Sequence, residues 1–247
     1  MSLIDDAKRF VADNIKAGFH DRRLAKVNGL KLRDVLQRKN PYLFRAKAVV
    51  SAPEMVSQIL DAYLSSQEET VFGDFLESLA GFVCGKVYGG VKPGTYGADL
   101  DFTRDGTRYL VSVKSGPVWG NASQKRRMLD EFGKARQIIG HKANLKMVNG
   151  CCYGRDSRPF KAKDNYLKLC GQDFWFLISN EPEMYHEIVE PLGFMAKQRN
   201  DEFHEAYGRA LTRFTQQFTA EFCDTDGAIQ WPKIVDLTSR SKKLWHP

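Results

Sequence analysis

The hydrophobic period of the chain changes near residue 99, and this change restricts the possible folds more than any other feature. Earlier in the chain, apolar residues recur three and four positions apart, as they do from Val56 to Leu64, and this spacing predicts amphipathic helices. From Asp99 to Phe102 the sequence alternates, and after an Asp-Gly turn at 105–106 it continues in the β-rich run 109–114. A two-stranded hairpin inside a largely helical chain indicates an α/β fold.

The same patterns predict further elements on both sides of the hairpin. Ser66 and Glu69 have the spacing of a capping box, which predicts that a second helix starts there and ends in the glycine-rich stretch 85–97. After the hairpin we expect a basic helix at about 122–140, strands near 147–153 and 173–179, and a C-terminal helix with Phe203, Tyr207, Ala210, Phe214 and Phe218 on one face.

These elements favour one domain over residues 1–247. A mainly helical segment (1–90) precedes an α/β core with a mixed β-sheet (91–180), and a helical segment (181–247) follows it. No repeat or low-complexity segment divides the chain.

Positive charge is gathered in three segments of a chain whose formal net charge is +7. Residues 22–47, 123–142 and 155–168 are rich in Lys and Arg, and the last is interleaved with aromatic residues. Such clusters favour a polyanionic partner, because each neutralised phosphate releases counter-ions. The alternative for each segment is an ordinary solvated helix face. Three clusters together favour nucleic acid.

Several other protein classes do not fit the sequence. No apolar run approaches the ~20 residues of a membrane helix, and the acidic N-terminus lacks the apolar segment of a signal peptide. The 5 cysteines form no CxxC pair, which is typical of reduced, buried thiols in a cytoplasmic protein. Because no HExxH motif is present, zinc is not expected.

The predicted hairpin carries residues suited to phosphodiester chemistry. Its first strand begins with Asp99, and its second strand ends in Lys114, with Ser112 on the same face as the lysine. Phosphodiester hydrolysis needs divalent cations held by carboxylates, and it benefits from a lysine beside the attacking water. The alternative for Lys114 is a solvated lysine at the end of a strand.

These residues resemble the signature of the PD-(D/E)xK nucleases. The match is Gly97-Ala98-Asp99-Leu100-Asp101-Phe102, with Lys114 following Asp99 by 15 residues. More of the chain, roughly residues 40–235, is similar to type II restriction endonucleases that cut interrupted, G/C-rich palindromes. The segments that carry this likeness are Asn40–Leu43, Phe72-Gly73, Lys114–Asn121, Gly171–Trp175 and Asp226–Trp231.

The resemblance implies a single nuclease domain with a restriction-endonuclease-like core and a Mg²⁺-dependent site. It assigns Asp99 to the metal and Lys114 to the attacking water. Ala98 in place of the proline is harmless, whereas Ser112 stands where the family has a second acid and so removes one metal-binding charge. We expect Glu77, on the preceding helix, to supply the missing carboxylate, unless it is a solvated helix-face residue. Asp101 is the reserve ligand, and the carbonyl of Val113 is a further oxygen donor.

The resemblance also implies double-stranded DNA as substrate and a homodimer as the working unit, because one chain has one such hairpin. The apolar face from Phe203 to Phe218 is either part of that dimer interface or buried in the monomer. A cognate DNA methyltransferase is expected as a genetic partner, and no membrane is expected. Trp119 either contacts DNA or packs. The full set of candidate DNA contacts is Trp119, Asn121, Gln124, Lys125, Arg126, Arg127, Arg155, Arg158, Lys161 and Lys163.

Two other functions remain open from the sequence. One is a repair or recombination nuclease with the same fold. The other is a DNA-binding protein derived from a nuclease that has lost its activity, with Ser112 as the inactivating change.

Overall fold

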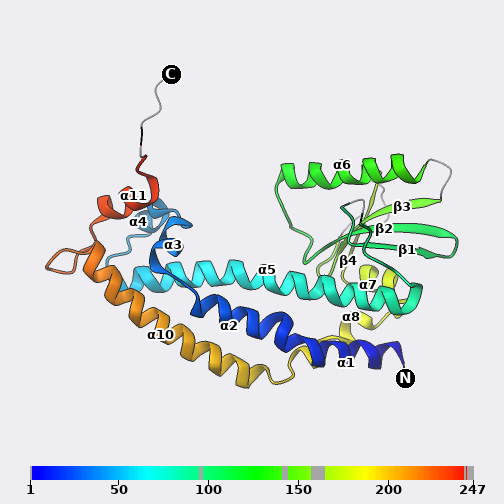
Figure 1. Cartoon of the computed structure of the whole chain (residues 1–247), viewed down its shortest axis with the longest axis horizontal. Coiled ribbons are helices and arrows are strands. Elements are labelled where there is room, and N and C mark those ends of the chain that lie inside the picture. Colours follow the sequence, from blue (N-terminus) through cyan, green and yellow to red (C-terminus); the bar gives the residue numbers. More distant parts are fainter. Residues whose placement is uncertain (1, 95–96, 141–143, 157–164, 242, 244–247) are drawn as a thin grey trace. The chain divides into compact units, whose positions relative to one another are not determined.

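The computed structural model describes residues 2–94, 97–140, 144–156, 165–241 and 243 (Figure 1). The chain forms two compact units. The first, which we call the sheet unit, comprises Met1–Gly18 and Phe72–Phe194. The second, which we call the helical unit, comprises Phe19–Val71 and Met195–Pro247.

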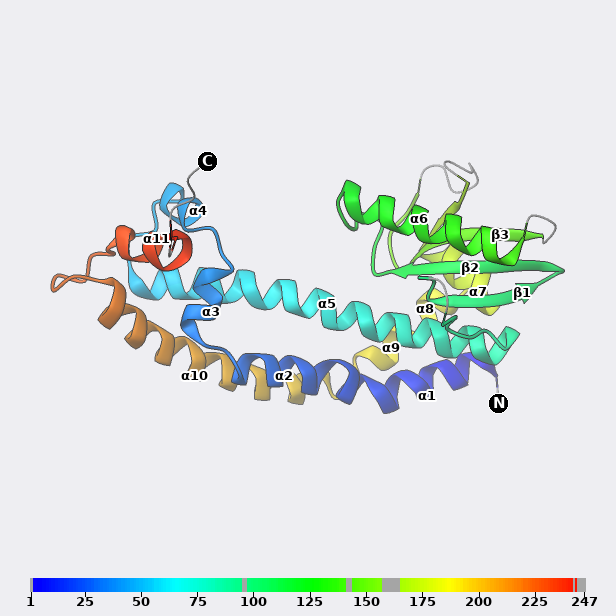
Figure 2. The ribbon, with the colours of Figure 1, turned by 45° about the horizontal axis from the view of Figure 1, so that its top comes forward.

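A four-stranded mixed sheet forms the centre of the sheet unit (Figure 2). The strands lie in the order β1 (Leu100–Arg104), β2 (Thr107–Lys114), β3 (Leu145–Cys151) and β4 (Leu167–Cys170). Strands β1 and β2 are antiparallel, whereas the pairs β2–β3 and β3–β4 are parallel. The predicted α/β fold, with a mixed sheet flanked by helices and helical segments at both ends of the chain, is confirmed.

The β1–β2 hairpin has the geometry that its turn residues predict. Asp105 and Gly106 have φ angles of 48° and 71°. Turns in which both central residues have positive φ match the twist of paired strands, and Asp-Gly suits them because neither residue is strongly strained there. The turn sets the register in which Leu100 pairs with Val111.

Helix α6 (Ala122–Ile139) connects β2 to β3 and packs on one face of the sheet. Its buried side chains Met128 and Phe132 contact Leu110 of β2 and Met147 of β3. Figure 2 shows this helix lying along the strands. The basic helix predicted at this position is confirmed, and its polar face remains exposed.

The strand predicted at 173–179 is wrong, because this segment is helix α7 (Gln172–Ser179). A short, nearly continuous apolar run does not distinguish a buried strand from a buried helix. Here Phe174, Trp175 and Ile178 are buried, whereas Phe176 is exposed. The fourth strand is instead β4, which begins at the end of the basic segment 155–168.

Gly150 of β3 is needed for the ring of Phe174 to pack against the sheet. A Cβ atom at Gly150 would lie 2.5 Å from two ring atoms of Phe174 and 3.0 Å from Val111 Cγ1. Because Phe174 is fully buried, its ring has little room to move.

We therefore expect Gly150→Ala to lower the free energy of unfolding by about 1–3 kcal/mol, the usual result of overpacking a core. The matched control is Gly133→Ala on the exposed side of α6, where nothing lies within 4 Å of the added atom. That change should raise stability by up to about 1 kcal/mol, because alanine favours a helix. Urea denaturation measures both variants. Equal stability of Gly150→Ala and the unmodified protein would show that Phe174 packs elsewhere.

Helix α5 runs without a break from Ala52 to Tyr88, so the helix start predicted at Ser66 is wrong. The hydroxyl of Ser66 donates to the carbonyl of Ala62 within the helix instead of capping a new one. On the second half of this helix Phe75, Leu76, Leu79, Ala80 and Val83 are buried, and Glu77 lies beside them, partly exposed.

The helical unit is built around one hydrophobic core. Its elements are α2 (Asp21–Asn28), α3 (Leu32–Gln37), α4 (Pro41–Ala46), the first part of α5, α10 (Ala196–Phe222) and α11 (Trp231–Ser239). The apolar face predicted on the C-terminal helix is part of this core: Phe203, Phe214 and Phe218 are buried and Tyr207 packs against them. Burial in the monomer therefore explains this stripe, and it is not a free dimer surface.

The remaining helices belong mainly to the sheet unit. They are α1 (Leu3–Ile15), the π-helical turn Lys16–His20, α8 (Met184–Glu187) and α9 (Val189–Leu192). None of the helices in the described ranges is both long and apolar enough to span a bilayer.

All 5 cysteines are buried and carry free thiols. Burial raises the pKa of the Cys84 and Cys152 thiols to about 12, so both stay protonated at neutral pH.

Candidate active site

Asp99 lies immediately before β1 and points at the end of β2. Its backbone N–H donates to the Val111 carbonyl at 2.8 Å, and its carboxylate Oδ2 accepts a hydrogen bond from the Val113 N–H at 2.7 Å. The side chain is 16% exposed. The hairpin therefore holds this carboxylate in a fixed position, as the spacing predicts.

Lys114, the last residue of β2, lies next to the Asp99 carboxylate. Its Nζ is 3.9 Å from Asp99 Oδ2 and donates to the Val113 carbonyl at 2.8 Å. It also lies 5.0 Å from the centre of the Trp119 ring. The lysine is thus partly enclosed and is not a solvated strand end. Trp119 packs against Lys114 and the α6 cluster, which supports the packing alternative for this residue.

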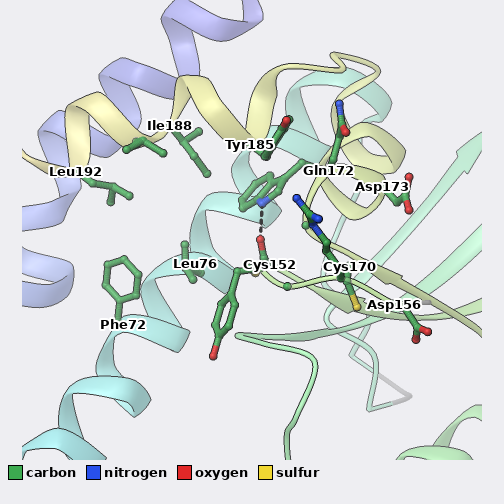
Figure 3. Close-up of a pocket in the computed structure, with 16 residues that line it drawn as sticks. Phe72, Leu76, Cys152, Asp156, Cys170, Gln172, Asp173, Tyr185, Ile188 and Leu192 are labelled. Carbon is green, nitrogen blue, oxygen red and sulfur yellow. Dashed lines mark hydrogen bonds between the residues drawn. The ribbon is translucent and has the colours of Figure 1, made fainter. Parts of the chain in front are cut away.

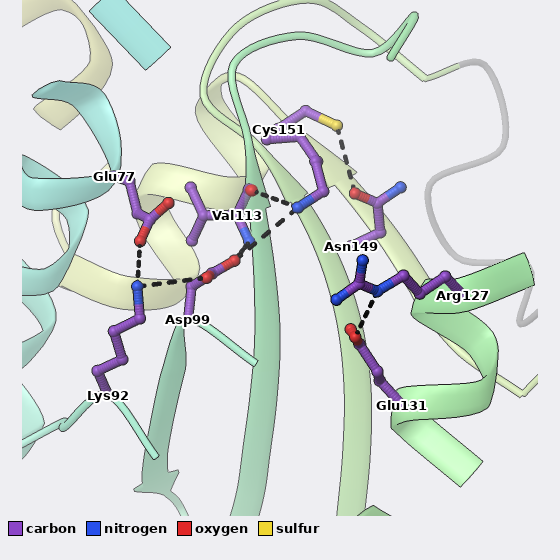
Figure 4. Close-up of polar contacts among 9 residues, drawn as sticks. Glu77, Lys92, Asp99, Val113, Arg127, Glu131, Asn149 and Cys151 are labelled. Carbon is purple, nitrogen blue, oxygen red and sulfur yellow. Dashed lines mark hydrogen bonds and ion pairs between the residues drawn. The ribbon is translucent and has the colours of Figure 1, made fainter. Parts of the chain in front are cut away.

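Glu77 of α5 is linked to Asp99 by an ion-paired lysine, Lys92. The sequence does not single out this lysine. Lys92 Nζ is 2.7 Å from Glu77 Oε1 and 3.8 Å from Asp99 Oδ1 (Figure 4). The structure therefore brings Glu77, Asp99 and Lys114 together as expected and adds Lys92. Only tertiary packing reveals Lys92, because it lies in the irregular segment between α5 and β1.

The electrostatic setting of Asp99 is that of a cation-binding carboxylate. Burial raises its pKa above the usual value, and the negative charge of Glu77 raises it further. Lys114 and the Val113 N–H oppose this effect. Two acids close together, one of them largely buried, favour a cation between them. The side chains present thus fit a hard divalent ion such as Mg²⁺, which prefers oxygen ligands.

The two other predicted residues are Ser112 and Asp101. Ser112 is buried, at 3% exposure, and strand alternation places it on the same face of β2 as Leu110 and Lys114. Asp101 accepts two hydrogen bonds from Arg108, at 2.9 and 2.6 Å. Its carboxylate is therefore paired with a cationic side chain, as that of Glu77 is with Lys92.

Few acidic side chains lie near Asp99 in the described part of the chain. Within the described part of the chain, no group of three or more His, Cys, Asp or Glu side chains could hold a metal ion. The oxygen donors at the site are thus Asp99, Glu77 and the carbonyl of Val113.

Glu131 of α6 is a further acid that the sequence analysis missed. A Cβ atom at Gly97 would lie 2.1 Å from Glu131 Oε2, so this carboxylate packs against the backbone two residues before Asp99. Arg127 donates to it at 3.0 Å (Figure 4). Its i,i+4 pairing with an arginine is the only sequence signal for its position.

The candidate DNA contacts fall into distinct groups. Asn121 and Gln124 form a capping box at the start of α6, so their side chains bind each other's backbone N–H groups. Lys125 and Arg126 are exposed on α6, and Arg127 is exposed although it pairs with Glu131. Arg155 is exposed too, whereas Arg158, Lys161 and Lys163 lie outside the described residues.

A pocket of about 680 Å³ adjoins the segment that follows β3 (Figure 3). Phe72 and Leu76 of α5 line it together with Arg155, and the indole of Trp175 donates to the Cys152 carbonyl at its wall. The Cys152 N–H in turn donates to the Lys114 carbonyl. One wall of this pocket is therefore attached to the end of β2.

The basic segment 22–47 in the helical unit is mostly exposed, with exceptions. Arg23 is partly buried, pairs with Glu68 and lies over the ring of Phe203 at 3.4 Å. Arg33 pairs with Glu221 at 2.7 Å. Arg23 therefore stabilises the fold, while the exposed residues Lys26, Lys31, Arg38, Arg45 and Lys47 remain available to a polyanion.

Comparison with known families adds an independent finding. A family model described as type II restriction endonuclease EcoO109I matches residues 5–200. The match includes the β1–β2 hairpin with Asp99 and Lys114, and also Glu77 and Lys92. No curated protein matches the chain.

Proposed function

Because this chain belongs to the EcoO109I family of type II restriction endonucleases, we propose that it hydrolyses double-stranded DNA at a specific palindromic or interrupted-palindromic site. The proposal includes a Mg²⁺-dependent site of the PD-(D/E)xK type. The observation that carries it is the meeting of Asp99, Lys114 and Glu77 at the end of one hairpin. A G/C-rich recognition site is part of the proposal, and it rests on the resemblance alone.

Asp99, Glu77 and the carbonyl of Val113 would hold the metal. When bound, Mg²⁺ supplies Lewis-acid polarisation of the scissile phosphate and a lower pKa for the attacking water. The N–H of Val113 fixes the Asp99 carboxylate, because the 2.7 Å hydrogen bond leaves it little rotational freedom. The second family acid is replaced by Glu77 in this proposal.

Lys114 acts on the water and the phosphate. Its ammonium is positioned by the Val113 carbonyl and by the face of Trp119, so it is held before DNA arrives. From this position it orients the attacking water, and its positive charge stabilises the negative charge that grows on the phosphate oxygens. Such preorganised charge is worth several kcal/mol in a partly buried site, on the order of 10³-fold in rate.

We propose a symmetric homodimer as the working unit. One chain provides one hairpin with this arrangement, and cutting two antiparallel strands at equivalent positions calls for two sites related by a twofold axis. Sedimentation at micromolar concentration, with and without DNA, tests this. A particle of about 28 kDa that makes double-strand breaks in one encounter would contradict it.

In this proposal the enzyme acts in the cytoplasm, and a cognate methyltransferase protects the host DNA as a genetic partner, without being a bound subunit. Incubation of plasmid with Mg²⁺ separates the alternatives. Discrete double-strand products support restriction, nicks directed by DNA structure support repair or recombination, and binding without cleavage supports a nuclease that has lost its activity.

Affinity for DNA should fall steeply as salt rises. The exposed basic residues of segments 22–47 and 123–142 offer many phosphate contacts, and each contact contributes about −0.9 to the slope of log K against log salt. We expect a slope of about −4 or steeper. Fluorescence anisotropy with a labelled duplex between low and moderate salt measures it. A slope near zero would mean that these side chains face bulk solvent in the complex.

A further inference from the structure

Lys92 lies between the two carboxylates to which we assign the metal. Its ammonium is 2.7 Å from Glu77 and 3.8 Å from Asp99 (Figure 4). The two acids come from different elements, α5 and the residue before β1, so a single cation links them. This is the arrangement that a bound divalent ion would require.

The fold fixes the position of Lys92. Val91, its neighbour, forms an isolated β-bridge with Asp101: the N–H of Val91 donates to the Asp101 carbonyl at 3.1 Å, and the reverse bond is 2.8 Å. The backbone at Lys92 is therefore attached to β1, next to Asp99. Its side chain remains 67% exposed, so it has room to leave the carboxylates without any backbone movement.

Charge balance explains why an ammonium is stable at this point. Asp99 is largely buried and faces the negative charge of Glu77, so both carboxylates need a counter-ion. The ion pair with Glu77 is short, and it raises the pKa of Lys92 above its usual value. A divalent cation would bind the same carboxylate oxygens. Because like charges repel at such short range, the ammonium of Lys92 and a divalent cation would not occupy this place together.

We propose that Lys92 is the resident counter-ion of the metal site: its ammonium occupies the place between Glu77 and Asp99 until a divalent cation displaces it. This inference rests on the proposed function. Lys92 is a positioning residue, because it keeps the two carboxylates together and charge-balanced in the metal-free protein. Its presence weakens metal binding, since every metal ion that binds must first break this ion pair.

The test is binding of Mn²⁺, a spectroscopic substitute for Mg²⁺, to the full chain without DNA, measured by electron paramagnetic resonance. Lys92→Met should bind Mn²⁺ roughly two- to fivefold more tightly than the unmodified protein, the range for loss of an exposed ion pair. Lys92→Arg, which keeps the charge, should stay close to the unmodified protein. The matched control is Lys86→Met, because Lys86 is also an exposed lysine in an ion pair, with Asp6 at 3.3 Å.

Thermal unfolding gives a second measurement on the same variants. Without metal, Lys92→Met should melt at a lower temperature than the unmodified protein, because Glu77 and Asp99 then repel each other without a counter-ion. Saturating Mn²⁺ should close this gap. Lys86→Met should show the same response to Mn²⁺ as the unmodified protein.

The outcomes separate this inference from the proposed function. If Asp99→Asn abolishes Mn²⁺ binding but Lys92→Met binds no more tightly than the unmodified protein, the metal site stands and the role of Lys92 is wrong. If Asp99→Asn binds Mn²⁺ as well as the unmodified protein does, the metal assignment itself fails, and the inference about Lys92 fails with it.

Discussion

Asp99→Asn and Lys114→Ala should each abolish DNA cleavage while leaving DNA binding largely intact. Asp99 is fixed by a backbone hydrogen bond from the opposite strand, and Lys114 lies 3.9 Å from it. Each change removes charge that stabilises the transition state, so we expect the cleavage rate to fall on the order of 10³-fold or more. Both variants keep the basic segments 22–47 and 123–142, to which we assign the phosphate contacts.

Single-turnover cleavage with excess enzyme measures the rate, and gel shift without Mg²⁺ measures the binding. Asp130→Asn and Lys86→Ala are the matched controls, since Asp130 lies on the exposed side of α6 and Lys86 pairs with Asp6. Both controls should cut normally. An Asp99→Asn protein that cuts at nearly the unmodified rate would overturn the assignment of the site.

Glu77→Gln should impair cleavage far more than Ser112→Ala. Lys92 pairs with both Glu77 and Asp99, whereas Ser112 is buried and offers a hydroxyl in place of a charged carboxylate. Loss of one of two metal-binding carboxylates should slow cleavage roughly 10²-fold or more, and loss of a buried hydroxyl should have a much smaller effect. Gln keeps the size of Glu77 and removes only its charge.

The same cleavage assay with Glu131→Gln tests whether Glu77 or Glu131 supplies the second metal-binding carboxylate. Glu131 packs against Gly97 but is engaged by Arg127, so its variant should retain most of the activity. An inactive Glu131→Gln protein with an active Glu77→Gln protein would show that α6, and not α5, supplies the second carboxylate. An inactive Ser112→Ala protein with an active Glu77→Gln protein would show that the metal site is built differently.

The hairpin could be predicted because its signals are local. Alternation in 99–102, an Asp-Gly turn and a β-rich run all act over a few residues, and the structure has β1, β2 and the turn at these positions. These signals place Asp99 and Lys114 in register without any knowledge of the tertiary fold. Glu77 is different, because only the resemblance to the nuclease family singles it out among the acids of its helix.

Other parts depend on tertiary contacts that no local pattern encodes. Helix α7 has the apolar run of a buried strand, and only its packing against Gly150 shows that the run is helical. Lys92 lies in an irregular segment, where no helical or strand periodicity predicts the direction of its side chain. Its position is fixed by the pairing of Val91 with Asp101. Strand alternation also favours Asp101 as a ligand, and its ion pair with Arg108 is a contact that the alternation does not predict.

The distinction between an active nuclease and an inactive descendant rests on Ser112. In the structure this serine is buried. The carboxylates of Glu77 and Asp99, linked by the ammonium of Lys92, belong to other elements. Glu77 is therefore available, through Lys92, as a second carboxylate near Asp99. In the proposed function, Glu77 of helix α5 takes the part of the acid that the resemblance expects at position 112.

The most direct measurement is digestion of a fully sequenced genome with the purified protein and Mg²⁺, followed by mapping of the DNA ends. We predict that the ends fall at a fixed position within one short palindromic or interrupted-palindromic sequence. They should be absent without Mg²⁺ and absent with Lys114→Ala. Ends scattered without a shared sequence, or the same ends produced by Lys114→Ala, would contradict a site-specific nuclease that works through this hairpin.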